Sequence, residues 1–141
     1  MIYISSDHIG VQLKEFIVNL FKSKNLAVED LGPVSSERVQ YTDFAKKLCT
    51  KVLENKDNKG ILICGTGVGM SMMANRHKGI RAALCTNEYM AKMTRLHNNA
   101  NVLCLGSRVI GIELAQAIVI EFLEGSFEGG RHEYRVNQLD R

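Results

Sequence analysis

The chain has 141 residues, 45% of them hydrophobic, a single proline and a formal net charge of +3. This length and apolar content predict one folded domain over 1–141 and exclude a disordered chain. The small charge argues against a nucleic-acid partner, and no apolar run approaches the ~20 residues that cross a bilayer. Because the N-terminus also lacks a signal-peptide pattern, we expect a soluble, cytoplasmic protein.

The predicted elements follow the recurrence of apolar residues along the chain. Residues 2–5 are typical of a buried strand, and 10–25 carry apolar side chains at helical spacing. A strand at 26–32, a loop at 33–42 and a helix at 43–55 follow. Strands are predicted at 60–64, 80–85 and 100–106. Three helices alternate with them: the first begins at 68, and the other two span 87–99 and 111–125. Residues 126–141 are polar, and we expect them to pack outside the main body.

Five apolar strands separated by helices predict an α/β fold. Parallel strands joined by helices are covered on both faces, and right-handed crossovers leave few topologies. We therefore expect a three-layer αβα sandwich around a doubly wound five-stranded parallel sheet of the Rossmann or flavodoxin-like kind. The expected strand order is 2-1-3-4-5.

Four cysteines occur, and none stands in a CxxC pair or beside a histidine. This spacing argues against a zinc site or a thioredoxin-like motif, and we expect free thiols. Cys49, Cys85 and Cys104 lie in predicted helices or strands and are expected to serve packing.

Cys64 is different, because it ends the third strand and is followed by glycines at alternate positions, Gly65, Gly67 and Gly69. Met70 stands where a phosphate-binding Walker loop needs its second glycine. A dinucleotide fingerprint would follow the first strand rather than the third. A glycine loop that opens a helix nevertheless presents backbone N–H groups to an anion.

Polar residues follow the other strands as well. Asp7 and His8 come after the first strand and Arg108 after the fifth, where ligands bind in open parallel sheets. We expect His97 and Asn98, at the end of the preceding helix, to lie on this same rim. An Asp after a strand is often only a helix cap, so that alternative stays open for Asp7.

The segments SSDHIGVQLK, GILICGTGVGMS, GIRAALC, RLHNNANVLCLGSRVIG and FEGGRHEYRV together resemble the ribose-5-phosphate isomerase type B family over nearly the whole chain. Relatives in that family act on galactose 6-phosphate and allose 6-phosphate. The resemblance implies a cofactor-free and metal-free aldose–ketose isomerase of the pentose phosphate pathway that works through a cis-enediolate.

The resemblance also assigns residues. It implies that Cys64 is the base that moves a proton between C1 and C2, and that His97 is the acid that opens the sugar ring. Thr66 is expected to assist ring opening or bind a sugar oxygen. Substrate binding is assigned to Asp7, His8, Asn98, the anion hole of Gly65, Gly67, Val68 and Gly69, and the phosphate ligands Arg108, Arg131 and Arg135, with His132 a weaker candidate.

Family members are dimers or tetramers whose sites are completed by both chains, which implies a homodimer here, with a tetramer left open. The 126–141 tail would then complete the phosphate site or the dimer interface. Met70, Met72 and Met73 form an apolar patch near the loop, which interface formation and core packing explain equally well.

Two alternatives to a ribose 5-phosphate isomerase remain from the sequence. A hexose-6-phosphate isomerase could use the same scaffold, although the presence of both Cys64 and His97 favours a self-sufficient chain. A non-catalytic sugar-phosphate-binding protein is the second alternative, but binding alone would not need Cys64.

Overall fold

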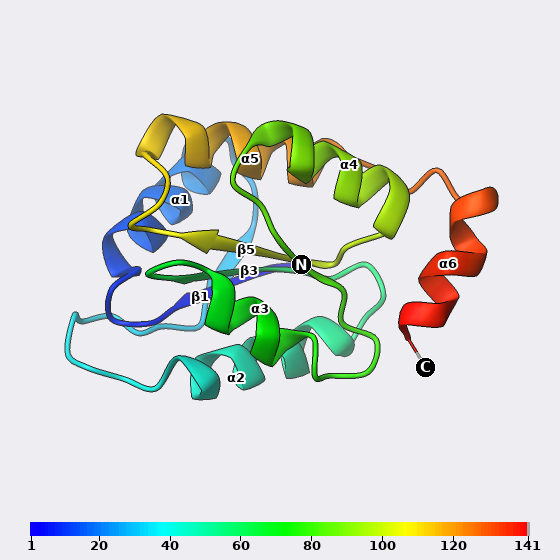
Figure 1. The fold of residues 1–141 in the computed structure, drawn as a ribbon. Coiled ribbons are helices and arrows are strands. Elements are labelled where there is room, and N and C mark those ends of the chain that lie inside the picture. Colours follow the sequence, from blue (N-terminus) through cyan, green and yellow to red (C-terminus); the bar gives the residue numbers. More distant parts are fainter. Residues whose placement is uncertain (141) are drawn as a thin grey trace.

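All five predicted strands are present and form one parallel sheet (Figure 1). The structure is a computed structural model that describes residues 1–140, so only the last residue of the predicted tail lies outside it. The strands are β1 (Ile2–Ser6), β2 (Val28–Asp30), β3 (Lys59–Cys64), β4 (Ala82–Leu84) and β5 (Val102–Gly106).

The predicted helices are also confirmed, with small differences at their ends. Asn87 begins α4 as expected, because its side-chain oxygen accepts a hydrogen bond from the N–H of Met90 at 2.8 Å. Gly125 follows the last residue of α5. The helices are α1 (Val11–Ser23), α2 (Tyr41–Leu53), α3 (Val68–Ala74), α4 (Glu88–Asn98), α5 (Ile112–Glu124) and α6 (Arg131–Leu139).

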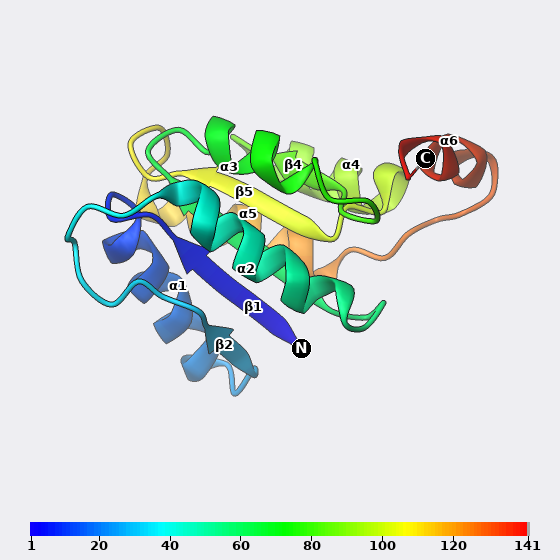
Figure 2. The ribbon, with the colours of Figure 1, turned by 90° about the horizontal axis from the view of Figure 1, so that it is seen from below.

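The helices cover the sheet on both faces, which confirms the three-layer sandwich. Helices α1, α4 and α5 lie on one face, and α2 and α3 lie on the other (Figures 1 and 2). Each face has its own apolar cluster, because successive strand residues point to opposite sides. Ile61 and Ile63 belong to the cluster under α1 and α5, whereas Leu62 and Cys64 belong to the cluster under α2 and α3.

The predicted strand order is wrong at one edge of the sheet. The observed order is β2-β1-β3-β5-β4, so β5 lies between β3 and β4, and β4 forms the edge of the sheet. Burial gives the physical reason. Every residue of β5 is buried, as a central strand requires, whereas the three residues of β4 are only partly buried. The short, partly exposed strand therefore takes the edge position.

Helix α6 lies outside the sandwich, beyond the end at which the strands begin (Figures 1 and 2). Asp140, which follows α6, pairs with Arg81 at 2.9 Å just before β4. The N–H of Glu128 donates to the carbonyl of Leu96 at 3.1 Å, which fixes the segment between α5 and α6 against α4. No helix within residues 1–140 is long and apolar enough to cross a membrane.

Candidate active site

The carboxyl ends of β1, β3 and β5 meet, because β3 pairs with both of its neighbours. The N–H of Asp7 donates to the carbonyl of Ile63 at 2.9 Å. The N–H of Ser107 donates to the carbonyl of Cys64 at 2.9 Å, and that of Arg108 to the carbonyl of Gly65 at 3.0 Å. This bonding places Asp7, Cys64 and Arg108 at the same end of the sheet, as the sequence predicted. We call it the thiol end.

Cys64 is the most accessible of the four cysteines, at 7% relative exposure. The backbone N–H of Gly67 donates a hydrogen bond to its sulfur at 3.1 Å. The sulfur therefore lies directly beside the backbone of the glycine loop. Burial raises the pKa of Cys49 to about 12 and that of Cys85 to about 11, so these thiols stay protonated at neutral pH. Burial also raises the pKa of Cys104.

The loop after Cys64 needs glycine at defined positions. Gly67 has a φ of +80°, a left-handed conformation that side chains disfavour. Gly106, at the end of β5, faces the loop, and a Cβ there would lie 2.6 Å from the carbonyl oxygen of Thr66. The hydroxyl of Thr66 accepts from the N–H of Val68 at 3.2 Å, at the start of α3. The loop is thus held close against the end of β5.

Asp7 is 6% exposed, and one of its carboxylate oxygens, Oδ1, accepts from the N–H groups of Ile9 and Gly10 at 2.9 and 3.0 Å. The turn that leads into α1 therefore depends on this side chain, but Asp7 is not the helix cap, because the N-cap of α1 is Gly10 and has no side-chain hydrogen bond. His8 accepts from the N–H of Val39 at 3.3 Å through Nδ1. This bond leaves Nε2 as the nitrogen that carries a proton in the neutral ring and can donate to an anion.

A cleft of about 600 Å³ opens beside these residues. Its lining includes His8 and Arg108, the two candidates for phosphate binding at this end. Gln12 and Ser36 also line the cleft, and they could not be predicted because neither stands in a recognisable sequence pattern.

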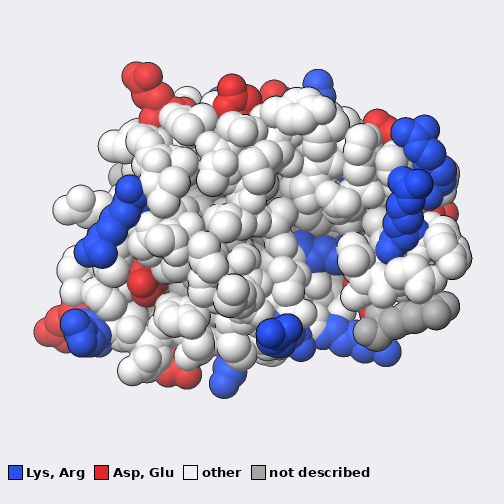
Figure 3. Space-filling view, in the orientation of Figure 1, with Lys and Arg blue, Asp and Glu red and all other residues white. Residues whose placement is uncertain are grey.

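The other predicted site residues lie at the opposite end of the molecule, so the expectation of a single rim within one chain is wrong. His97 and Asn98 end α4, only four residues before β5 begins. A crossover helix runs against the strands, and its last residues therefore return to the amino end of the sheet. Arg131 and Arg135 lie on α6 beyond that same end, and both are exposed. Lysine and arginine side chains gather on the surface over α6 (Figure 3). We call this the histidine end.

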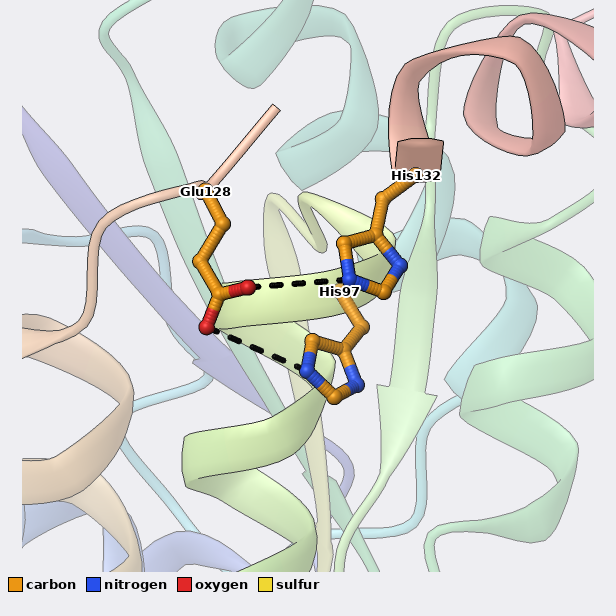
Figure 4. A group of neighbouring side chains, drawn as sticks. All are labelled: His97, Glu128 and His132. Atoms are coloured by element: carbon orange, nitrogen blue, oxygen red, sulfur yellow. Dashed lines mark ion pairs between the residues drawn. The ribbon is translucent and has the colours of Figure 1, made fainter. Parts of the chain in front are cut away.

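At the histidine end His97 stacks on His132, with ring centroids 4.2 Å apart and planes inclined by 13° (Figure 4). Glu128 faces both rings. One carboxylate oxygen lies 3.9 Å from Nε2 of His97, and the other lies 3.6 Å from Nε2 of His132. Sequence reasoning missed Glu128, because a single acidic residue in a polar segment carries no recognisable pattern.

The pKa of His132 is lowered by its burial and by the positive charges of His97, Arg131 and Arg135, while Glu128 acts in the opposite direction. His132 is buried at 6% exposure, whereas the side chain of His97 is 37% exposed. The more accessible ring of the pair is therefore the one predicted to act on the substrate.

The predicted methionine patch is correct only in part. Met70 is fully buried in the cluster under α2 and α3, and Met73 packs against that cluster. Met72 is 62% exposed. Helical geometry explains the difference, since residues two positions apart on a helix face different directions.

Comparison with known proteins connects both ends of the molecule to one family. Residues 2–139 match the family model described as Ribose/Galactose Isomerase. Ribose-5-phosphate isomerase B of Escherichia coli is 46% identical over 133 residues, which cover 94% of this chain and 89% of that protein. Among solved structures, a ribose 5-phosphate isomerase of Thermotoga maritima is 52% identical, with a TM-score of 0.96 over 99% of this chain and 96% of that one. Ribose-5-phosphate isomerase B of Mycoplasma genitalium, solved with bound ribulose 5-phosphate, is 47% identical, with a TM-score of 0.95 over 99% and 93%. With matches of this extent, the chain belongs to the ribose/galactose isomerase family.

Proposed function

We propose that this protein interconverts ribose 5-phosphate and ribulose 5-phosphate through a cis-enediolate. The observation that carries the proposal is the sulfur of Cys64, placed at a strand end with the N–H of Gly67 at 3.1 Å and a glycine loop beside it. The complex of the Mycoplasma genitalium relative with ribulose 5-phosphate supports this choice of substrate.

In the proposed reaction the Cys64 thiolate removes the proton from C2 of the open-chain aldose. The electron pair of that C–H bond forms the C1–C2 double bond, and the carbonyl electrons move onto O1. Backbone N–H groups of the loop stabilise this oxyanion, the kind of contribution that is worth roughly 3 kcal/mol per donor. The thiol then returns the proton to C1, the O2 hydroxyl loses its proton as O1 gains one, and C2 becomes the ketone.

The remaining groups bind the sugar and open its ring. His97 protonates the ring oxygen of the furanose, Thr66 assists this step, and Asn98 and Asp7 hold sugar hydroxyls. Phosphate is held by His8 with Arg108, Arg131 and Arg135. A guanidinium group suits this role because it can donate two parallel hydrogen bonds to the oxygens of one phosphate.

We further propose that the working protein is a homodimer in which each site joins the thiol end of one chain to the histidine end of the other. The separation of these two ends within one chain supports this arrangement. Two-fold symmetry would then produce two equivalent sites. A surface suited to a partner lies along α3 and α4, beside the edge strand β4. Its exposed apolar residues are Val68, Met72, Tyr89 and Met90.

The experiment that tests the proposed reaction compares kcat/KM for ribose 5-phosphate, allose 6-phosphate and galactose 6-phosphate. We expect ribose 5-phosphate to be preferred. A higher value for either hexose phosphate would identify a hexose-6-phosphate isomerase on the same scaffold. Binding of all three without turnover would identify a sugar-phosphate-binding protein, in which Cys64 has no catalytic use.

A further inference from the structure

Glu128 stands in the segment between α5 and α6, and the proposed reaction gives it no role so far. Its backbone N–H donates to the carbonyl of Leu96 at 3.1 Å, so the residue is fixed against the end of α4. From there its carboxylate reaches the stacked pair of His97 and His132, with a different oxygen toward each ring (Figure 4). One negative charge therefore serves two imidazoles.

The same three side chains have donor atoms within 4.8 Å of one another, a spacing that could suit a metal ion. The ring geometry argues against that use. The lone pair of each imidazole lies in the plane of its ring, and the two planes are stacked and inclined by only 13°. Nearly parallel lone pairs do not converge on a single ion at bonding distance. The arrangement suits a shared proton better.

Burial decides which ring holds that proton. Nε2 of His132 has no hydrogen-bond partner within residues 1–140, and its ring is almost entirely buried. A charged ring there would lose its hydration, and the cations Arg131 and Arg135 on α6 oppose it further. Two charged rings stacked at 4.2 Å would also repel each other. The single proton that Glu128 can compensate is therefore placed on the more exposed ring, His97.

We infer that Glu128 is a positioning residue that holds one proton on the stacked pair of His97 and His132 and keeps it on His97, as imidazolium. The inference rests on the proposed function, in which this proton passes to the ring oxygen of the sugar. The contact of 3.9 Å between Glu128 and His97 is longer than a hydrogen bond, so Nε2–H stays available to a substrate oxygen.

The test is Glu128→Gln, which keeps the size of the side chain and removes its charge. Ring nitrogen chemical shifts in NMR report the protonated fraction of each histidine at neutral pH. We expect the protonated fraction of His97 to fall in the variant. An exposed ion pair of this kind shifts such an equilibrium by roughly two- to fivefold. Turnover of ribose 5-phosphate should fall by a similar factor. C1/C2 proton exchange with ribulose 5-phosphate, which has no ring to open, should stay near the wild-type rate, as it should in His97→Asn.

Glu133→Gln is the matched control, because it also removes a carboxylate. Glu133 is exposed on α6, and the ion pairs of His97 and His132 are formed with Glu128 instead. It should leave both readouts unchanged. An unchanged protonated fraction of His97 in Glu128→Gln overturns the inference, and so does an equal loss of proton exchange and ribose turnover. If the wild-type protein does not isomerise ribose 5-phosphate, the proposed function fails. The NMR comparison then still decides whether Glu128 holds the proton.

Discussion

Cys64 differs from the other cysteines in two respects that decide its reactivity. Its sulfur accepts the N–H of Gly67, and it lies at the end of a strand, whereas burial keeps Cys49, Cys85 and Cys104 protonated. Iodoacetamide should therefore modify Cys64 first, with loss of activity, and substrate should protect it. Mass spectrometry of the digested protein identifies the modified residue. Modification of another cysteine at the point of half-inactivation would remove Cys64 as the reactive group.

Replacement of the sulfur tests its role in the chemistry. Cys64→Ser should fold normally and lose nearly all isomerase activity, since a hydroxyl is much less acidic than a thiol and a poorer base. Circular dichroism and the thermal unfolding midpoint check the fold. Activity above about a tenth of wild type would show that another group moves the proton.

The proposed reaction does not require a metal ion. The base is a thiolate, the acid is an imidazole and the phosphate ligands are guanidinium groups, so no step calls for a Lewis acid. Activity should be the same before and after prolonged dialysis against EDTA. A loss that Mg²⁺ or Mn²⁺ restores would replace the thiol-base mechanism with a metal-assisted hydride shift.

At the scale of elements, the loop of residues 65–67 depends on its close packing against the end of β5. A Cβ on Gly106 would lie 2.6 Å from the oxygen and 2.7 Å from the carbonyl carbon of Thr66, and backbone cannot move aside as a side chain can. Gly106→Ala should therefore lower the free energy of unfolding by roughly 1–3 kcal/mol and reduce activity by displacing the loop.

Urea denaturation measures the effect, with Gly111→Ala as the control. A Cβ on Gly111 would meet no atom within 4 Å, and its φ of -80° suits any residue. Because Gly111 is the N-cap of α5, where alanine is less favourable than glycine, the control should lower stability by less than about 1 kcal/mol. Equal stability in the two variants would show that the loop is not held by this contact.

Helix α6 presents Arg131 and Arg135 about one turn apart, because four residues separate them along the helix. Arg135→Ala should raise KM strongly and lower kcat/KM by about ten- to a hundredfold, the equivalent of roughly 1.5–3 kcal/mol for a charge-assisted hydrogen bond. Steady-state kinetics with ribose 5-phosphate measures both values. Lys22→Ala removes an exposed cation from α1 and should have no effect. Similar losses in both variants would indicate general electrostatic attraction rather than a phosphate ligand.

The elements themselves could be predicted well from sequence, and their lateral order could not. Apolar periodicity placed each strand and each helix up to α5 to within a few residues, because it reports which faces are buried, whereas α6 lies in the tail that was expected only to be polar. It carries no information on which strand lies beside which. The exchange of β4 and β5 follows from burial over the whole sheet, since the partly exposed residues Ala82–Leu84 suit an edge.

For the whole molecule, the two halves of the proposed site lie at opposite ends of one chain. Sequence reasoning identified Cys64 and the glycine loop from their own pattern, because both follow directly from a strand end. It placed His97 on the same rim as Cys64, at the carboxyl ends of the strands. His97 lies near the end of α4, shortly before β5 begins, and it therefore lies at the amino end of the sheet. Glu128 was missed altogether, since its use depends on the stacking of His97 on His132, a contact between distant segments. Local patterns thus predict each half, whereas the relation between the halves depends on the proposed homodimer.

The central claim is that a thiol end from one chain and a histidine end from another form one isomerase site. Production of Cys64→Ser and His97→Asn chains together, with different affinity tags, yields mixed dimers that can be purified and counted by mass spectrometry. In such a dimer one site carries both substitutions and the other carries neither. Purified mixed dimers should therefore reach about half of the wild-type turnover of ribose 5-phosphate per dimer, and an unpurified random mixture about a quarter, although each variant alone is nearly inactive. Turnover no greater than the mean of the two separate variants would contradict the shared site.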